Sequence, residues 1–73
     1  MRQYNYVKLN FDELVRETEK AILLSFEGNE YWIPISLIDE DEFYEEEGIV
    51  YVADWFVEQE GLDPYIDEED TWN

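Results

Sequence analysis

The absence of cysteine is the feature that most limits what this chain can fold into. A chain this short buries only about 60% of the surface that it exposes when unfolded, so its core must be thin. Without cysteine, neither disulfides nor thiolate metal sites can supplement that core. Three Trp, six Tyr and four Phe residues must carry the packing, and an apolar fraction of 45% is too high for a disordered acidic tail. These features indicate one folded domain.

The first twenty residues contain one segment with a clear β pattern. Residues 4–11 alternate, with Val7, Leu9 and Phe11 on one face, which is the period-2 signature of a half-buried strand. Residues 11–20 are polar and mixed in charge, with Leu14 and Val15 as their only aliphatic side chains. This second segment is interpreted as a short helical turn or as a loop that continues into the next strand.

The middle of the chain predicts a β-hairpin. Residues 21–26 and 31–37 are two β-prone runs, and residues 27–30 between them include a Gly and an Asn that tolerate positive φ. Pro34 cannot donate a ladder hydrogen bond, which places the second arm at a sheet edge or gives it a bulge there.

The remaining elements complete a mostly β, α+β prediction. Residues 39–47 form a connecting loop, and residues 49–52 form another short strand. Asp54 is a plausible N-cap for a helix over residues 55–60, and Gly61 is placed to end that helix. We therefore expect a small antiparallel sheet or a partly open barrel of three to five strands with one short C-terminal helix. Residues 1–62 form the domain, and residues 63–73 form an acidic, mobile tail except where Tyr65, Ile66 or Trp72 docks.

The charge of the chain is distributed very unevenly. All four basic residues lie in the first twenty positions, where four acids cancel them. Residues 21–73 contain no Lys, Arg or His and therefore carry the whole formal charge of −17. Such a surface repels nucleic acid and anionic membranes and attracts basic protein patches.

A comparison with DNA gives this charge a scale. A compact chain of this length has a radius of gyration of roughly 11 Å, hence a diameter of roughly 29 Å. About 29 Å of duplex carries about 17 phosphate charges, because duplex DNA has one charge per ~1.7 Å of axis. The charge per length of the domain therefore permits DNA mimicry.

Two short motifs carry a resemblance. Residues 32–36, Trp-Ile-Pro-Ile-Ser, resemble a W-I/L-P-K-S motif that ends a β-hairpin in a widespread group of small phage and prophage proteins, with Ile35 where Lys is usual. Residues 55–62 resemble the W-L-x-E-x-x-G-L helix of the same group, with Phe56 and Val57 in place of Leu and a small residue. The resemblance covers roughly residues 4–62. It implies a compact, mostly β domain of mobile-element origin, a setting in which small acidic proteins often inhibit host defences such as CRISPR or restriction complexes.

The composition argues against catalysis and against a built metal site. Without His and Cys, the chain lacks the commonest general base, the Cys nucleophile and most zinc ligands. Paired carboxylates need a cleft that so small a domain can hardly enclose. Residues 39–41 or 67–70 could collect Ca²⁺ weakly, but Phe43 and Tyr44 occupy positions where the EF-hand pattern needs an oxygen ligand and Gly. We expect no enzyme, no cofactor and no specific metal site.

The predicted partner site is the loop of residues 39–47, where seven carboxylates flank two aromatic residues. Aromatic side chains supply contact energy and charges supply steering, so Phe43 and Tyr44 are candidate anchors in a pocket of the partner. Alternatively, the acids form a solvated loop while the two aromatic residues close one end of the core. The site consists of Asp39, Glu40, Asp41, Glu42, Phe43, Tyr44, Glu45, Glu46 and Glu47.

Other candidate features receive a structural interpretation. Trp32 and Trp55 each sit in a predicted regular element and are expected to pack across the sheet and the helix. The acidic run 67–70 with Trp72 resembles a hook, yet terminal charge runs usually only solubilise. Five further acids would extend a negative surface if the hairpin tip and the helix end face the same way: Glu27, Glu30, Glu58, Glu60 and Asp63.

These observations favour a phage or mobile-element inhibitor that binds a basic nucleic-acid-binding protein of the host by mimicking phosphate charge. The alternative is a non-catalytic structural or accessory subunit of a phage assembly, and a third possibility is a halophile surface. We expect no direct nucleic-acid binding and no membrane span, since the longest apolar stretch is far shorter than the ~20 residues that cross a bilayer. No signal segment is recognisable at Met1, so the expected location is the host cytoplasm.

Overall fold

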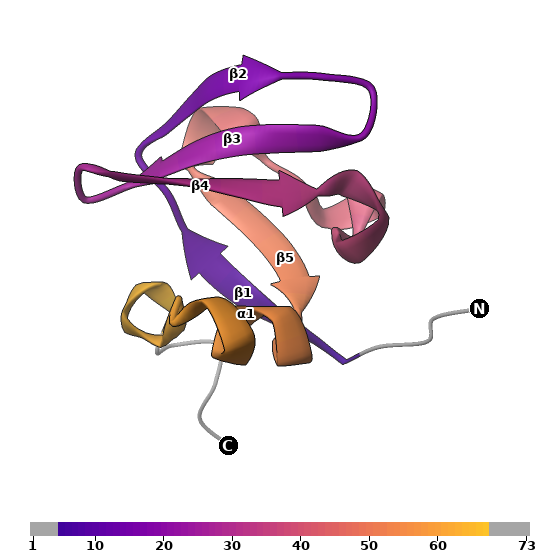
Figure 1. Ribbon diagram of the computed structural model, residues 1–73, viewed down its shortest axis with the longest axis vertical. Coiled ribbons are helices and arrows are strands. Elements are labelled where there is room, and N and C mark those ends of the chain that lie inside the picture. Colours follow the sequence, from indigo (N-terminus) through magenta and orange to yellow (C-terminus); the bar gives the residue numbers. More distant parts are fainter. Residues whose placement is uncertain (1–4, 68–73) are drawn as a thin grey trace.

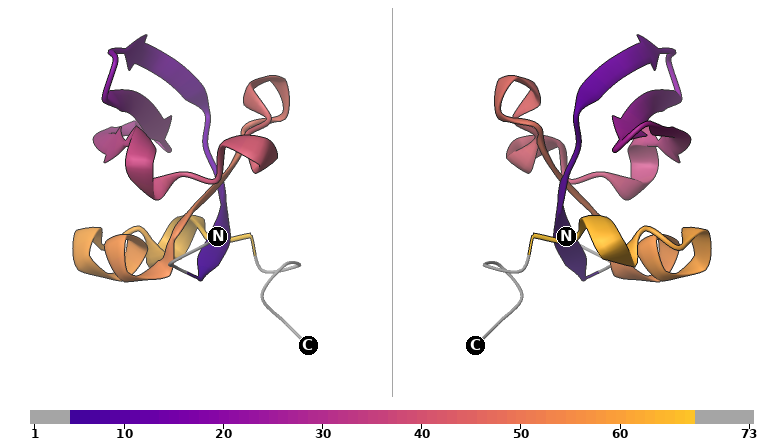
Figure 2. Two further views of the ribbon diagram at one scale, coloured as in Figure 1. Left: turned by 90° about the vertical axis from the view of Figure 1, so that its right-hand side faces the viewer. Right: turned by 90° about the vertical axis from the view of Figure 1, so that its left-hand side faces the viewer.

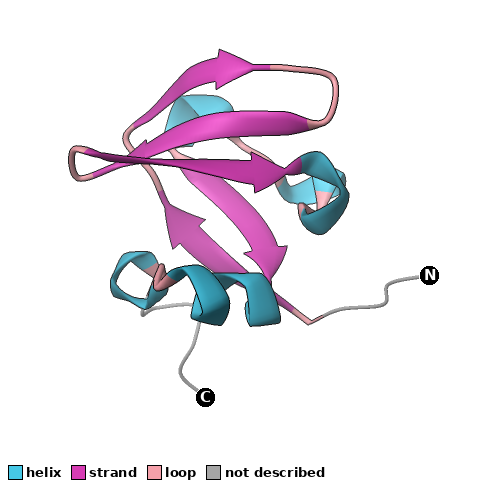
Figure 3. Ribbon diagram, in the orientation of Figure 1, coloured by secondary structure: helices cyan, strands magenta, loops and turns pink. Residues whose placement is uncertain are grey.

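Two antiparallel sheets and one helix form the domain in the computed structural model, which describes residues 5–67 (Figures 1 and 3). The two sheets do not close into a barrel. The prediction of a mostly β, α+β domain with one short C-terminal helix is confirmed. The two-stranded sheet contains β1 (Tyr6–Asn10) and β5 (Ile49–Ala53), and the three-stranded sheet has the order β2 (Glu13–Glu17), β3 (Ala21–Phe26) and β4 (Asn29–Pro34).

The β1–β5 pair forms the centre of the core. Leu9 lies opposite Val50, and Val7 lies opposite Val52, so the alternating apolar side chains of the two strands share one face. Leu9, Val50 and Val52 are completely buried. The alternation predicted for residues 4–11 is confirmed, with a strand of five residues within that range.

The predicted hairpin is present, with a tighter turn than the sequence suggested. Glu27 and Gly28 alone connect β3 to β4, and both have positive φ, 53° and 91°, as a type I′ turn requires. Asp12 supports this turn because its Oδ2 accepts a 2.7 Å hydrogen bond from the Glu27 amide. The positive φ therefore falls on Glu27, whereas Asn29 already belongs to β4.

Residues 13–17 form a strand, β2, where the sequence predicted a helical turn or a loop. The strand pairs antiparallel with β3, and its register shifts between Leu14 and Arg16, which marks a β-bulge at Val15. Leu14 lies opposite the buried Leu24. Pairing with β3 decides the conformation here, because the local pattern of the segment is too weak to do so.

Pro34 lies at the end of β4, which pairs with β3 alone among the strands of residues 5–67, so the prediction of an edge strand is confirmed. The helix α1 (Asp54–Glu60) follows β5 without a loop. Asp54 is the first helical residue and its side chain caps nothing, so the predicted N-cap is wrong. Its amide instead donates to the carbonyl of Asn5, 2.8 Å away, which ties the helix start to the chain before β1. Gly61 ends the helix in the left-handed conformation, as predicted.

The core lies between the two sheets and α1, which packs beneath them through Phe56 and Val57 (Figures 1 and 2). The radius of gyration is 11.2 Å and the extents are 33 × 28 × 24 Å. The buried apolar residues are Leu9, Phe11, Ile22, Leu24, Phe26, Ile33, Leu37, Ile38, Val50, Val52, Ala53, Phe56, Val57 and Leu62.

The chain stays against the domain beyond the boundary predicted at Leu62. The short 3-10 turn η4 (Asp63–Tyr65) places the Tyr65 ring on Phe26, with 4.9 Å between ring centroids. Ile66 forms a bridge with Leu9, and Asp67 pairs with Lys8 at 3.4 Å. The acidic run 68–70 and Trp72 lie outside the described residues. No helix within residues 5–67 has the length and apolar character needed to cross a membrane.

Candidate functional site

The predicted partner site, residues 39–47, is here called the acidic loop, and it follows the edge of β5. The Asp39 amide donates to the Tyr51 carbonyl at 3.0 Å, and Tyr44 and Ile49 exchange two backbone hydrogen bonds of 2.9 and 3.1 Å. The carboxylates of the loop are therefore carried by a hydrogen-bonded backbone. The segment contains the 3-10 turns η2 (Glu40–Glu42) and η3 (Glu45–Glu47), and it follows η1 (Ile35–Leu37).

Asp39 has a structural role within this loop. It is 8% exposed, and its Oδ1 accepts a 3.2 Å hydrogen bond from the Asp41 amide, which caps the first turn of η2. A partner cannot reach this carboxylate as it can reach the exposed ones. Asp39 therefore shapes the loop and is not among the groups that the loop presents to solvent.

Phe43 faces the core side of the loop. Its ring is half-buried, packs against the core and lies 6.0 Å from the ring of Phe11. This agrees with the alternative in which an aromatic residue closes one end of the core. Phe43 does not project outward as an anchor.

Tyr44 is the aromatic residue of the loop that faces solvent, with 43% of its surface exposed. Its hydroxyl donates a 2.9 Å hydrogen bond to Glu42 Oε1. This hydrogen bond and the negative charge of Glu42 raise the pKa of Tyr44 above its ordinary value of 10.0. The hydrogen bond places the Tyr44 hydroxyl beside the Glu42 carboxylate.

Most of the remaining carboxylates of the loop are open to solvent. Glu42 is half-buried beside Tyr44, and five others are exposed. The three of η3 and Tyr44 line a shallow hollow of about 360 Å³. A run of exposed carboxylates on an ordered turn can attract cationic groups. The exposed five are Glu40, Asp41, Glu45, Glu46 and Glu47.

A small apolar groove adjoins the acidic loop and is here called the loop groove. It has a volume of about 250 Å³ and a mainly apolar lining that includes Phe43 and the buried Ile22 and Ile38. Glu40 of the loop and Glu17 of β2 also line this groove. Sequence reasoning missed this groove because Glu17 and Ile22 lie far from the loop along the chain, and only the fold of β2 and β3 brings them there.

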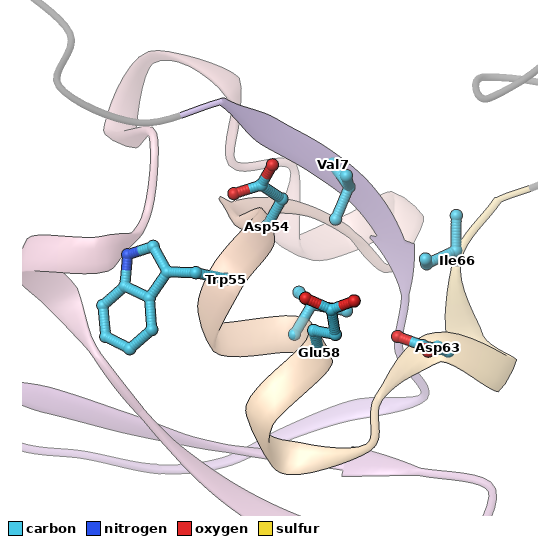
Figure 4. Close-up of a pocket in the computed structure, with 7 residues that line it drawn as sticks. Val7, Asp54, Trp55, Glu58, Asp63 and Ile66 are labelled. Atoms are coloured by element: carbon cyan, nitrogen blue, oxygen red, sulfur yellow. The ribbon is translucent and has the colours of Figure 1, made fainter.

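A larger groove, the helix groove, lies beside α1 and has a volume of about 570 Å³. Its apolar side chains come from three segments: Val7 from β1, Val57 from α1 and Ile66 from the end of η4. Figure 4 shows the Glu58 carboxylate between the carboxylates of Asp54 and Asp63. The Trp55 ring is directed away from Ile66. The acids of the groove are Asp54, Glu58 and Asp63, and Trp55 also contributes to the lining.

The expected packing of the two tryptophans is wrong. Trp32 is 47% exposed and Trp55 is 43% exposed. Trp32 lies opposite Leu23 on the outer face of the three-stranded sheet, because its neighbour Ile33 takes the inward position on β4. Trp55 occupies the outward side of α1, since Phe56 and Val57 fill the inward side.

The hairpin tip and the helix end lie side by side. Asn29 Nδ2 donates a 3.3 Å hydrogen bond to the Tyr65 hydroxyl, and Figure 1 shows the β3–β4 turn and η4 on the same side of the molecule. The hairpin tip and the helix end therefore face the same way, which is the arrangement that an extended negative surface requires. The five acids named for it are all exposed: Glu27, Glu30, Glu58, Glu60 and Asp63.

Within residues 5–67, no group of three or more carboxylates converges in a way that could hold a metal ion. No family model, no curated protein and no solved structure matches this chain.

Proposed function

We propose that this protein is a non-catalytic inhibitor of mobile-element origin that binds a basic nucleic-acid-binding protein of the host. Its carboxylates would occupy the Lys- and Arg-lined channel in place of phosphates. The observation that carries this proposal is the acidic loop, in which five exposed carboxylates are held on a hydrogen-bonded backbone next to an apolar groove.

The electrostatics support a cationic partner. From Ala21 onward the chain has no basic side chain, so no ion pair with a neighbour in that region reduces the field of the loop. Lys8 is paired with Asp67, whereas Arg16 and Lys20 lie on and after β2, near the loop groove, and offset only part of the negative charge there. An unneutralised surface of this kind raises the rate of association with a basic protein.

The dimensions are compatible with a nucleic-acid channel. The longest extent of the domain is 33 Å. A duplex of about that length carries about 19 phosphate charges, because one charge occupies ~1.7 Å of axis. The formal charge of −17 is of the same order. The domain therefore has a size and charge close to those of the duplex segment that it would replace.

The loop groove adds a contact that charge alone lacks. Charges at an interface mainly steer association, whereas apolar contact in a desolvated pocket contributes most of the binding energy. Phe43 forms a wall of this groove, so an aliphatic or aromatic side chain of the partner would enter the groove. The sequence predicted that Phe43 inserts into a pocket of the partner. In this proposal the partner instead inserts a side chain into the groove beside Phe43.

Affinity capture followed by competition tests the proposal. The tagged protein should retain a nucleic-acid-binding protein from host lysate, and added duplex DNA should displace it. Retention should fall steeply at about 1 M salt, where the Debye length is about 3 Å. Capture that survives this salt unchanged, or that DNA does not compete, contradicts the electrostatic mechanism.

A matched pair of variants locates the interaction. E45Q/E46Q/E47Q removes three charges from η3, and E13Q/E19Q/E27Q removes three exposed charges elsewhere. The first variant should reduce capture by about tenfold or more, the size expected when at least 1.4 kcal/mol of binding free energy is lost. The second should change it much less. Equal losses would show that only total charge matters and would remove the loop from the proposal.

The outer face of the three-stranded sheet favours a second candidate function, that of a structural or accessory subunit of a phage assembly. Val15 is 39% exposed and Trp32 is 47% exposed on elements of that sheet, and Leu23 lies opposite Trp32. Such a face suits a subunit interface in a larger assembly. W32S should then abolish association, and E45Q/E46Q/E47Q should leave it intact, which is the reverse of the outcome expected for the inhibitor.

A further inference from the structure

The helix groove is separate from the acidic loop. In Figures 1 and 2, η3 and α1 lie toward opposite ends of the molecule. The lining of the helix groove shares no residue with the loop groove or with the hollow lined by Tyr44 and η3. The helix groove is therefore a second, separate place where a partner could make contact.

The groove combines two kinds of lining. Val57 is 1% exposed, and Val7 and Ile66 are half-buried, so they form a fixed apolar floor. Asp54, Glu58 and Asp63 are exposed and stand around this floor (Figure 4). A volume of about 570 Å³ is in the range of small ligand sites, about 300–1,000 Å³.

Helix stability accounts for Asp54, which lies in the first turn of α1 where the helix dipole favours an acid, but it does not account for Glu58. α1 has no basic residue in its last turn, and Glu58 lies in the C-terminal half of the helix. Negative charge near a helix C-terminus is unfavourable because the helix dipole is negative there. Glu58 also takes part in none of the side-chain hydrogen bonds or ion pairs found for α1 in residues 5–67. A ligand that neutralises the groove would offset this unfavourable arrangement.

We propose that the helix groove binds one basic side chain, Lys or Arg, from an extended segment of the protein partner. Such a side chain has an aliphatic stem and a cationic end. The stem would contact Val7, Val57 and Ile66, and the cationic end would reach Glu58 and one of the two acids beside it. An anionic or neutral ligand does not match three carboxylates, and an unbranched apolar ligand leaves them without a partner.

The inference rests on the proposed function only for the basic character of the partner. The groove would be a second contact point, distant from the loop. Two contact points on one small domain raise the total affinity because the second binding event becomes intramolecular.

The test uses the full chain and the peptide acetyl-Gly-Arg-Gly-amide as the probe. Methyl NMR signals of Val7, Val57 and Ile66 should shift with a Kd on the order of 1 mM, a weak affinity suited to one side chain. The same peptide with citrulline, the neutral isostere of Arg, should shift them far less. Equal shifts with citrulline, no shifts at about 10 mM peptide, or shifts confined to Ile38 and Ile49 beside the acidic loop would overturn the proposal.

A variant pair in α1 provides the matched control. E58Q should weaken binding of the arginine peptide about three- to tenfold, the range expected from loss of one charge-assisted contact. E60Q removes the same charge from the same helix, but Glu60 does not contribute to the groove, so the effect should stay below about twofold. Equal weakening by both variants would show diffuse attraction and no site.

The two proposals fail separately. If E58Q leaves peptide binding unchanged while E45Q/E46Q/E47Q still reduces capture of the host protein, the helix groove is not a site and the inhibitor proposal stands. If the peptide binds as expected and no basic host protein is captured, the groove binds cations and the inhibitor proposal is wrong.

Discussion

The acidic loop and the helix groove both combine carboxylates with aromatic residues, but they are built in different ways. In the loop the acids form two runs, 39–42 and 45–47, close together in the sequence, and two loop members, Asp39 and Phe43, turn inward to stabilise the fold. In the groove the acids come from α1 and η4 and surround an apolar floor that partly belongs to β1. A dense run of charge in the sequence thus identifies a surface that can steer a partner. A hollow that can hold a side chain cannot be identified in this way, because its lining comes from segments that only the fold brings together.

One element of each region, η3 in the loop and α1 in the groove, also ends in a glycine of nearly the same conformation. Gly48 ends η3 with φ 70° and ψ 38°, and Gly61 ends α1 with φ 72° and ψ 33°. Their surroundings differ, because a Cβ on Gly48 would meet the Phe11 carbonyl oxygen, and a Cβ on Gly61 would meet nothing within 4 Å. The pair allows the packing of the two regions to be compared at constant backbone conformation.

The largest expected effect is that of G48A. The left-handed conformation costs a residue with a side chain about 1 kcal/mol, and the collision with Phe11 adds about 2 kcal/mol. G61A should cost only the first of these amounts. Urea denaturation followed by circular dichroism measures both free energies of unfolding. Equal losses would mean that the backbone of the loop can move away from Phe11, so the loop would be less firmly held than the groove.

A second comparison uses one aromatic residue from each region. F43A removes a half-buried ring that packs on Phe11 and should lower the free energy of unfolding by about 2 kcal/mol. W55A removes a ring that is 43% exposed and should cost less than about 1 kcal/mol. Denaturation of both variants under the same conditions checks this order. The reverse order would show that Trp55, and not Phe43, closes the core.

The fold class was predictable because strand alternation and the hairpin are local signals. Leu9, Val50 and Val52 take inward positions in the strands that the apolar pattern indicated. Gly61 ends the helix because a left-handed residue favours Gly whatever its surroundings. Predictions of this kind need only neighbours in the sequence.

The β2 strand, the positions of the tryptophans and the two grooves could not be predicted, because they depend on contacts between segments that are distant in the sequence. β2 forms because β3 offers a pairing edge, although residues 13–17 have little β pattern. The tryptophans could not be placed, since the choice between Trp32 and Ile33 for the inward position depends on strand register. The acidic loop was visible as a charge run, but the inward turn of Asp39 and Phe43, the loop groove and the helix groove all require contacts between distant segments.

Salt provides a third way to compare the regions. Repulsion among uncompensated carboxylates weakens as salt rises, so the melting temperature should increase by several degrees, roughly 4 °C or more, between about 0.01 M and about 0.15 M salt. E45Q/E46Q/E47Q should lose more of this increase than E13Q/E19Q/E27Q, because every charged residue near η3 in the sequence is acidic, whereas Glu13 and Glu19 are near Arg16 and Lys20. A melting temperature independent of salt in all three proteins would show that the carboxylates are well dispersed.

The smallest expected effect concerns Tyr44, whose pKa is raised first by its hydrogen bond to Glu42 and then by the charge of that carboxylate. A raised pKa means that the neutral phenol is favoured in the folded state. The associated stability is therefore complete below the ordinary value of 10.0 and is lost as the pH rises through the higher folded-state pKa. E42Q should move the titration of Tyr44, followed by its ultraviolet absorbance between about pH 9 and pH 12, toward the ordinary tyrosine value. E47Q should move it less, because Glu47 contributes the weakest of the causes and no hydrogen bond. If both substitutions shift the titration equally, Tyr44 responds only to the general field of the acidic loop, and its ring is then free to leave Glu42 for an aromatic contact with the partner.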